Sequence, residues 1–167
     1  LTWKATGIGE GYSSIAIANG RIFTMGDLDD GSYVIVLNEA NGAHIWKTRI
    51  GEAGGHKRYP GPRGTPTIDN GDVLVLNQYA DLVCLDAESG TTKWSENLVD
   101  QYGGKMMSGW KYSESPLVDG HRVICTPGGP NGTLLALDRK SGETLWQTKG
   151  WTDPAGYSSV ITATIDG

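Results

Sequence analysis

Apolar positions along this chain come in short runs of about four residues rather than in helical stripes. Runs such as Val34–Leu37, Leu82–Leu85 and Leu134–Leu137 end at Asp or Asn. Each is followed by a polar turn containing Gly and by a second short segment that ends in Trp. Runs of this length bounded by turn residues are typical of strands, and no stretch keeps helical periodicity over three turns. The pattern therefore predicts an all-β chain of antiparallel strands.

The turn and its flanks occur three times in one form, Leu-[Asp/Asn]-x-x-[Ser/Asn]-Gly-x-x-x-Trp. The copies cover residues 37–46, 85–94 and 137–146. The Asp or Asn side chain can bond the backbone two residues on, and Gly supplies the positive φ that the turn needs. Because Trp follows Gly at the same distance each time, we expect equivalent indoles that anchor neighbouring repeats. The predicted docking residues are Gly42, Trp46, Asp86, Gly90, Trp94, Asp138, Gly142 and Trp146.

A second repeated element precedes each motif. Asn19-Gly20, Asn70-Gly71, Asp119-Gly120 and Asp166-Gly167 stand between β-branched or aliphatic segments, which is a strong hairpin signal. Each repeat then has four strands, and a period of about 50 residues indicates a repeat architecture. Four-stranded antiparallel units of this kind are the blades of β-propellers. We expect blades at roughly residues 12–48, 61–97 and 112–149.

The two ends of the chain extend this pattern. Residues 1–4 have the character of the last strand of a preceding blade, and residues 157–167 that of the first strand of a following one. Three blades do not close a ring, so we expect about three complete blades plus parts of two more, in a fragment of a longer protein.

Charge and composition narrow the functions. The chain of 167 residues has a formal net charge of −5, whereas a nucleic-acid-binding domain carries a clustered basic face. No apolar run approaches the length of a membrane span. Cys84 and Cys125 have no metal-ligand spacing and are expected to be small buried residues, with a disulfide between them left open. The acidic stretch Asp27–Gly31 lacks the ligand spacing of a calcium loop, so we expect a solvated turn and no metal site.

The stretch Ala136-Leu137-Asp138-x-x-Ser141-Gly142-x-x-x-Trp146 resembles the tryptophan-docking repeat of the PQQ-like β-propellers, the quinoprotein alcohol dehydrogenase-like superfamily. The resemblance extends over essentially the whole chain. Within this superfamily, the chain is most similar to bacterial secreted propellers of unassigned activity. It implies a ring of seven or eight blades with the first strand of each blade innermost. It also implies that the connections between blades share one face with the loops between second and third strands, and that the protein is periplasmic or secreted.

The connections between blades are long, and long loops on a rigid scaffold commonly carry binding. Aligning the blades places Ser14, Thr65, Ser115 and Ser159 in a ring at the mouth of the axis. These hydroxyls either satisfy backbone groups where blades converge or belong to a polar pocket with an aromatic rim. In the second alternative six residues are ligand-binding candidates: two charged residues that orient the ligand and four aromatic residues that form the walls of the pocket. These are Arg63, Glu114, Trp110, Tyr112, Trp151 and Tyr157.

The resemblance implies two alternative functions. PQQ-dependent dehydrogenases of this fold bind the quinone near the axis with calcium and a catalytic carboxylate. This chain has no adjacent Cys pair and no Cys-x-x-Cys-His haem motif, and no calcium-ligand set can be mapped onto it. We therefore expect a binding or scaffold module that holds a protein, peptide or small-molecule ligand on its loop face, with no evident cofactor. The alternative is a quinoprotein alcohol dehydrogenase whose catalytic residues lie mainly outside this segment, with PQQ and calcium as cofactors.

Overall fold

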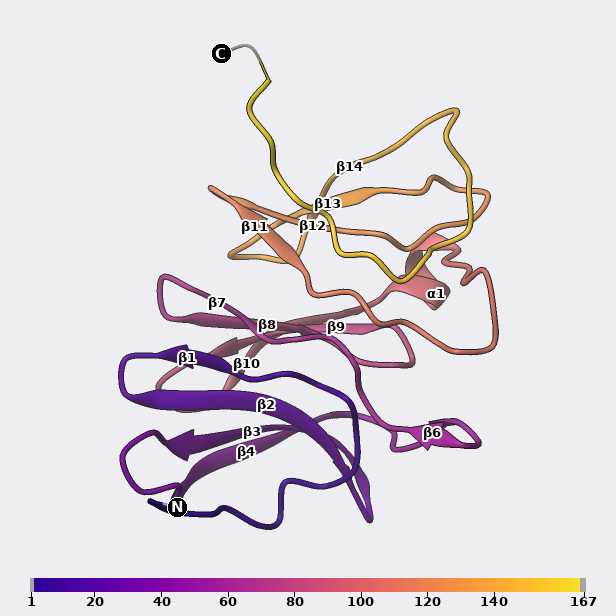
Figure 1. The fold of residues 1–167 in the computed structure, drawn as a ribbon. Coiled ribbons are helices and arrows are strands. Elements are labelled where there is room, and N and C mark those ends of the chain that lie inside the picture. The colour runs from indigo at the N-terminus through magenta and orange to yellow at the C-terminus, as the bar shows by residue number, and fades with distance from the viewer. Residues whose placement is uncertain (1, 166–167) are drawn as a thin grey trace.

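The computed structural model describes residues 2–165, which form three four-stranded antiparallel sheets stacked on one another (Figure 1). The first sheet contains β1 (Ala16–Ala18), β2 (Arg21–Leu28), β3 (Gly31–Asn38) and β4 (His44–Gly51). The second contains β7 (Thr67–Asp69), β8 (Asp72–Leu76), β9 (Asp81–Asp86) and β10 (Thr92–Asn97). The third contains β11 (Leu117–Asp119), β12 (Arg122–Cys125), β13 (Leu135–Asp138) and β14 (Thr144–Gln147). The predicted all-β fold of four-stranded blades is confirmed.

The strands of each sheet lie in chain order, and the three first strands lie beside one another. Strand β7 contacts both β1 and β11. The turns that join the first to the second strand and the third to the fourth strand of each blade lie at one end of the stack, whereas the connections between blades and the turns between second and third strands lie at the other (Figure 1). We call this second end the loop face. It is the face on which the sequence placed the candidate ligand-binding residues.

Two small elements occur in connections that we had expected to be irregular. Strands β5 (Gly55–His56) and β6 (Tyr59–Pro60) form a short hairpin in the connection between the first and second blades. Helix α1 (Leu98–Tyr102) begins the next connection. The Asn97 side chain caps it by accepting from the N–H groups of Val99 and Asp100, and Gly103 ends it in the left-handed conformation. A helix of five residues is too short to leave a periodic pattern, so local capping decided it.

An irregularity of strand pairing recurs at the same place in every blade. The register shifts between the third and fourth strands just before the motif Trp. As a result Trp46 pairs with Val36, Trp94 with Cys84, and Trp146 with Ala136. This β-bulge, which the turn pattern did not reveal, turns each indole toward the next blade.

Alternating side chains of the central strands build two separate cores. From β8, Val73 and Val75 pack against the first blade, whereas Leu74 and Leu76 pack against the third. All four are buried. Because both faces of an interior blade are covered, its strands appear in the sequence as continuous apolar runs rather than as alternating ones. Burial between sheets is therefore what holds consecutive blades together.

The segments before the first blade and after the third carry no strand among residues 2–15 and 158–165. The expected flanking strands at 1–4 and 157–167 include Leu1, Asp166 and Gly167, which lie outside the described residues. The blade limits 12–48, 61–97 and 112–149 likewise stay predictions, although each range contains one complete four-stranded sheet up to its last few residues.

Candidate functional site

The motif Trp of one blade lies on the motif Gly of the next. A Cβ atom added to Gly90 would come within 2.7 Å of the Trp46 indole, and one added to Gly142 within 2.9 Å of the Trp94 indole. Both glycines have φ above +70°. Trp46 Nε1 donates to the carbonyl of Ala87 (3.3 Å), and Trp94 Nε1 donates to that of Arg139 (2.8 Å). The two accepting residues hold the same place in the motif, so these indoles occupy equivalent positions.

The turns that receive the indoles are built by local hydrogen bonds. Asp86 Oδ1 accepts from the N–H groups of Glu88 and Ser89, and Asp138 Oδ1 accepts from those of Lys140 and Ser141. The bonds from Ser89 and from Lys93 lower the pKa of Asp86 to about 2. These carboxylates shape a turn and are not directed at a ligand.

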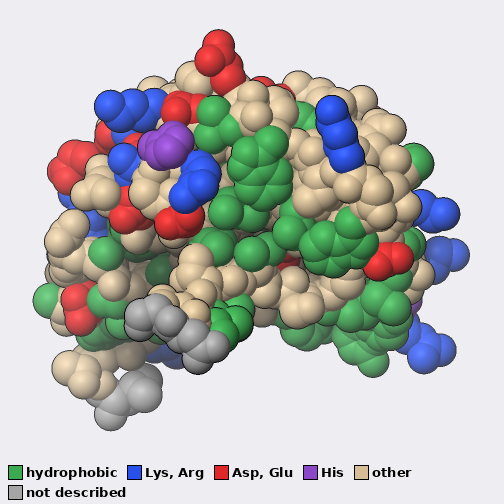
Figure 2. Space-filling model, turned by 90° about the horizontal axis from the view of Figure 1, so that it is seen from above, with side chains coloured by type: hydrophobic (Ala, Val, Ile, Leu, Met, Phe, Trp, Pro, Cys, Tyr) green, Lys and Arg blue, Asp and Glu red, His purple; other side chains and the backbone are tan. Residues whose placement is uncertain are grey.

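Trp3 shows the same arrangement before the first blade, whereas the Trp146 indole of the third blade is open to solvent. Trp3 Nε1 donates to Glu39 (3.1 Å), and its ring lies 2.5 Å from a Cβ built on Gly42, so Trp3 is a docking residue that sequence reasoning left out. Its signal was its place 43 residues before Trp46. Trp146 is 38% exposed, against 8% for Trp94. Figure 2 looks onto the stack from the side of the third blade, where hydrophobic side chains are open to solvent.

The predicted hydroxyl ring links neighbouring blades. The Thr65 N–H donates to Ser115 Oγ (2.8 Å), and the Ser115 N–H donates to Ser159 Oγ (2.9 Å). The same bond therefore recurs from the second blade to the third and from the third to residues after it. The Ser115 and Ser159 hydroxyls satisfy backbone groups, as in the first of the two alternatives considered from the sequence.

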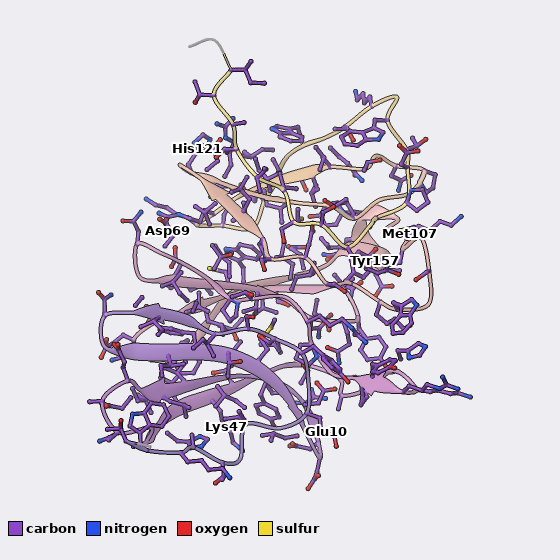
Figure 3. All side chains as sticks on the ribbon, viewed as in Figure 1. Glu10, Lys47, Asp69, Met107, His121 and Tyr157 are labelled. Carbon is purple, nitrogen blue, oxygen red and sulfur yellow. The ribbon has the colours of Figure 1, made fainter. Side chains whose placement is uncertain are left out.

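Three of the six ligand-binding candidates meet on the loop face. Arg63, Trp110 and Tyr157, together with Ser113, line a cavity of about 320 Å³. They come from the connections before the second blade, before the third blade and after the third blade. Figure 3 shows Tyr157 and Met107 close together at the end of the stack near α1, while Asp69 and His121 lie at the opposite end. The cavity therefore belongs to the loop face alone.

A cluster of aromatic rings extends from this cavity. The His56 ring stacks on the Trp110 indole with 4.3 Å between centroids, and the Tyr59 ring lies 5.2 Å from the same indole. Tyr12 meets Tyr59 edge to face at 6.0 Å. Arg63 donates to the carbonyl groups of Tyr59 and Gly61, which fixes its guanidinium beside the cluster. His56 and Tyr59 are not among the candidates predicted from the sequence, because their pairing with Trp110 spans more than 50 positions.

The other three candidates lie apart from this cavity. Tyr112 is buried and donates to the Pro127 carbonyl (2.8 Å), although it also lines a neighbouring cavity of about 390 Å³. Glu114 is 3% exposed, and its Oε1 accepts from the Thr126 N–H (2.6 Å). Burial raises the pKa of Glu114 to about 7. Trp151 lines a third cavity of about 310 Å³ and donates to Asp153.

The cysteines and the acidic loop have structural surroundings. Cys84 and Cys125 are buried free thiols, and burial raises the pKa of Cys84 to about 12. Asp27 is buried rather than solvated, because its carboxylate accepts from the Gly54 N–H (2.6 Å) and from Gln78 Nε2 (3.1 Å). The acidic stretch is thus tied to the next connection, which the expectation of a solvated turn missed.

A quinone–calcium site would need several metal-ligating side chains close together. Among residues 2–165 no group of three or more His, Cys, Asp or Glu side chains is placed to hold a metal ion. The described residues do not fit the calcium that accompanies PQQ, and no step of quinone chemistry can be assigned to them. In the same part of the chain, no helix is long and apolar enough to cross a bilayer.

Repeated four-stranded blades joined by Trp–Gly docking define the class of PQQ-like β-propellers. A family model described as outer membrane protein assembly factor BamB matches residues 2–167. The chain belongs to this family.

Individual relatives agree with this assignment. BamB of Shigella dysenteriae serotype 1 (strain Sd197) is 31% identical over 141 residues, which cover 81% of this chain and 31% of that protein. BamB of Burkholderia pseudomallei (strain K96243) is 26% identical over 148 residues, covering 87% and 34%. The chain thus spans about a third of the length of the curated relatives it matches.

Solved structures show the same fold. BamB from Moraxella catarrhalis superposes with a TM-score of 0.57 at 22% identity, over 89% of this chain and 39% of that one. The quinohemoprotein alcohol dehydrogenase from Comamonas testosteroni gives a TM-score of 0.63 at 18% identity, over 87% and 22%. At these identities the likeness concerns the fold alone.

Proposed function

We propose that this chain is part of a non-catalytic scaffold that holds a protein partner across its loop face. One observation carries the proposal. Aromatic side chains from separate connections stand exposed together on that face, where Tyr12 is 55%, Tyr59 40%, Trp110 44% and Tyr157 43% exposed. Tyr and Trp are enriched in protein–protein interfaces, where they supply large contact areas at low entropic cost.

The surface is also rigid in the way that a docking site requires. The Gly55 N–H donates to the Tyr79 hydroxyl (2.8 Å), and the Tyr12 N–H donates to the Pro62 carbonyl (2.8 Å). The Tyr157 hydroxyl bonds Ser108 Oγ. Side chains held before a partner arrives lose less entropy on binding.

The alternative, a quinoprotein dehydrogenase, draws only on likeness of fold. Relatives that are 31% identical over most of the chain are named as outer membrane protein assembly factors. A catalytic role for the whole protein would depend on residues outside the described ones. The scaffold is therefore the better supported of the two functions.

The remaining features of the proposal follow from the family. Because three sheets do not close a ring, the further partners of this segment are the remaining blades of its own protein. The names of the relatives refer to outer-membrane assembly, which supports a periplasmic location. The alternative location is outside the cell, as a secreted protein.

Site-specific photo-crosslinking tests the proposal in cells that express the full-length protein. Tyr59 is replaced by p-benzoyl-phenylalanine, and the matched control carries the same residue at Lys140, which is exposed in a hairpin turn of the third blade, away from the loop face. We expect a discrete protein adduct from position 59 and none from position 140. Equal adducts from both positions, or none from either, would refute a partner on the loop face.

A further inference from the structure

Two segments of the loop face, beside the aromatic cluster, contain basic residues and no carboxylate. Between Ala53 and Ile68 there are three formal positive charges, Lys57, Arg58 and Arg63, and no carboxylate. Between Gly103 and Ser113 there are Lys105 and Lys111, again with no carboxylate. The whole chain nevertheless has a formal net charge of −5. Basic residues are thus gathered in these two segments, whereas the carboxylates of the same connections, Glu52, Asp100 and Glu114, lie outside them.

Two of these basic side chains stand at cavities. Arg63 lines the cavity of about 320 Å³, with its guanidinium 5.8 Å from the Tyr12 ring centroid. Lys111 lines the neighbouring cavity of about 390 Å³, with Nζ 5.2 Å from the Tyr79 ring centroid. Lys111 also has φ of +71°, a left-handed conformation that residues other than Gly, Asn and Asp seldom adopt. Strain of this kind is concentrated at functional sites.

One connection separates the two cavities. Ser108 and Lys111 line the larger cavity, whereas Trp110 and Ser113 line the smaller one. An elongated ligand lying across this connection would meet both basic groups and both cavities. One carboxylate, Asp100, also lines the larger cavity. Glu114, the next acidic residue, is buried behind this surface.

On the basis of the scaffold function proposed above, we propose that the loop face binds an acidic peptide segment of its partner in an extended conformation. Carboxylates of the segment pair with Arg63 and Lys111, and an apolar side chain of the segment enters the cavity walled by Trp110 and Tyr157. Arg presents a planar donor fork that matches a carboxylate, and Lys supplies a point charge.

The lining of the smaller cavity favours a peptide over a glycan or a nucleic acid. A sugar ring requires several hydrogen-bonding side chains for its hydroxyls, whereas Arg63 and Ser113 are the main polar groups beside Trp110 and Tyr157. The Tyr157 hydroxyl is already bonded to Ser108. A nucleic acid requires many phosphate contacts, whereas the two cavities offer only Arg63 and Lys111 as cationic groups.

Binding of defined probes to the full-length protein tests the inference. The first probe is an octapeptide that alternates Asp and Phe, acetylated and amidated at its ends, with a fluorescent label for polarisation measurements. The others are the same peptide with Lys in place of Asp, an oligogalacturonate and an eight-residue oligothymidylate. We expect the acidic peptide to bind best, and to weaken as salt is raised because the paired charges are exposed.

Variants locate the binding. Arg63→Gln and Lys111→Gln are each expected to weaken the acidic peptide about fivefold, the effect of one exposed charge pair. Lys140→Gln, the matched control in a hairpin turn of the third blade, should change nothing. Since Arg63 also bonds the carbonyl groups of its own loop, Lys111→Gln keeps the test valid if Arg63→Gln unfolds.

Each alternative outcome is decisive. Equal binding of the acidic and basic peptides, preference for either non-peptide probe, or no binding of any probe would overturn the acidic-peptide inference. If the Tyr59 cross-link to a protein persists in such a case, the scaffold function stands and only the ligand chemistry is wrong. If the cross-link is also absent, both proposals fail.

Discussion

Glu114→Gln should change how stability depends on pH. The carboxyl group is buried beside Tyr112 and Cys125, and its Oε2 has no hydrogen-bond partner among the described residues. Burial raises the pKa of Glu114 from 4.5 to about 7, against the opposing effect of the bond from Thr126. Gln keeps the size of the side chain and an oxygen that accepts from Thr126, but it cannot ionise.

The sign and size of the effect follow from the pKa. Between pH 4.5 and pH 7 the folded state binds more protons at Glu114 than the unfolded state does, so stability falls as pH rises through this interval. Each pKa unit corresponds to 1.36 kcal/mol, and the full loss above pH 7 is about 3 kcal/mol. The wild type loses this stability as pH rises and the Gln variant does not. The free energy of unfolding of the variant minus that of the wild type should therefore increase by about 2 kcal/mol from pH 5 to pH 8.

Urea unfolding followed by tryptophan fluorescence at pH 5 and pH 8 measures the gap between the two proteins, that is, the difference between their free energies of unfolding. Glu143→Gln, at an exposed carboxylate in the turn of the third motif, is the matched control. A gap that stays constant with pH would refute the reasoning. The same widening in the Glu143 variant would show that the effect does not come from burial.

Three further predictions concern docking and cofactor. Trp94→Ala should cost about 4 kcal/mol because the indole is buried between blades, whereas Trp110→Ala should cost about 1 kcal/mol or less; equal losses of thermal stability would contradict this assignment. Gly90→Ala should destabilise the protein more than Gly71→Ala. Both glycines have positive φ, but only a Cβ at position 90 would collide with Trp46, at 2.7 Å from its indole. Equal unfolding midpoints in urea would count against docking. Titration of the full-length protein with PQQ and calcium should leave its absorption spectrum unchanged, and saturable uptake with alcohol oxidation would support the dehydrogenase instead.

The turns and strands could be predicted from the sequence because their physics is local. Asp86 and Gly90 are four positions apart, and the Asx bonds and positive φ that they supply need no other part of the chain. The period of the motif then fixed the blade architecture, because a four-stranded sheet with two apolar faces is stable only when other sheets cover it.

The candidate site was only partly predictable. The long connections indicated Arg63, Trp110 and Tyr157, and these three line one cavity. Nothing in the sequence separated them from Glu114, which is buried, or from Trp151, which lines a different cavity. Loops carry no periodicity, so the direction of each side chain depends on contacts made after folding.

The strands and turns could be predicted from the amino-acid sequence because each depends on residues within about ten positions of one another, and the return of the motif about every 50 residues then indicated the propeller blades. Tertiary packing was needed to show that His56 stacks on Trp110, that Glu114 is buried with one oxygen unpaired among residues 2–165, and that Arg63 lines one cavity with Trp110 and Tyr157. Those relationships join residues of different blades. Their geometry is set by the packing of whole sheets, which no local pattern of residues encodes.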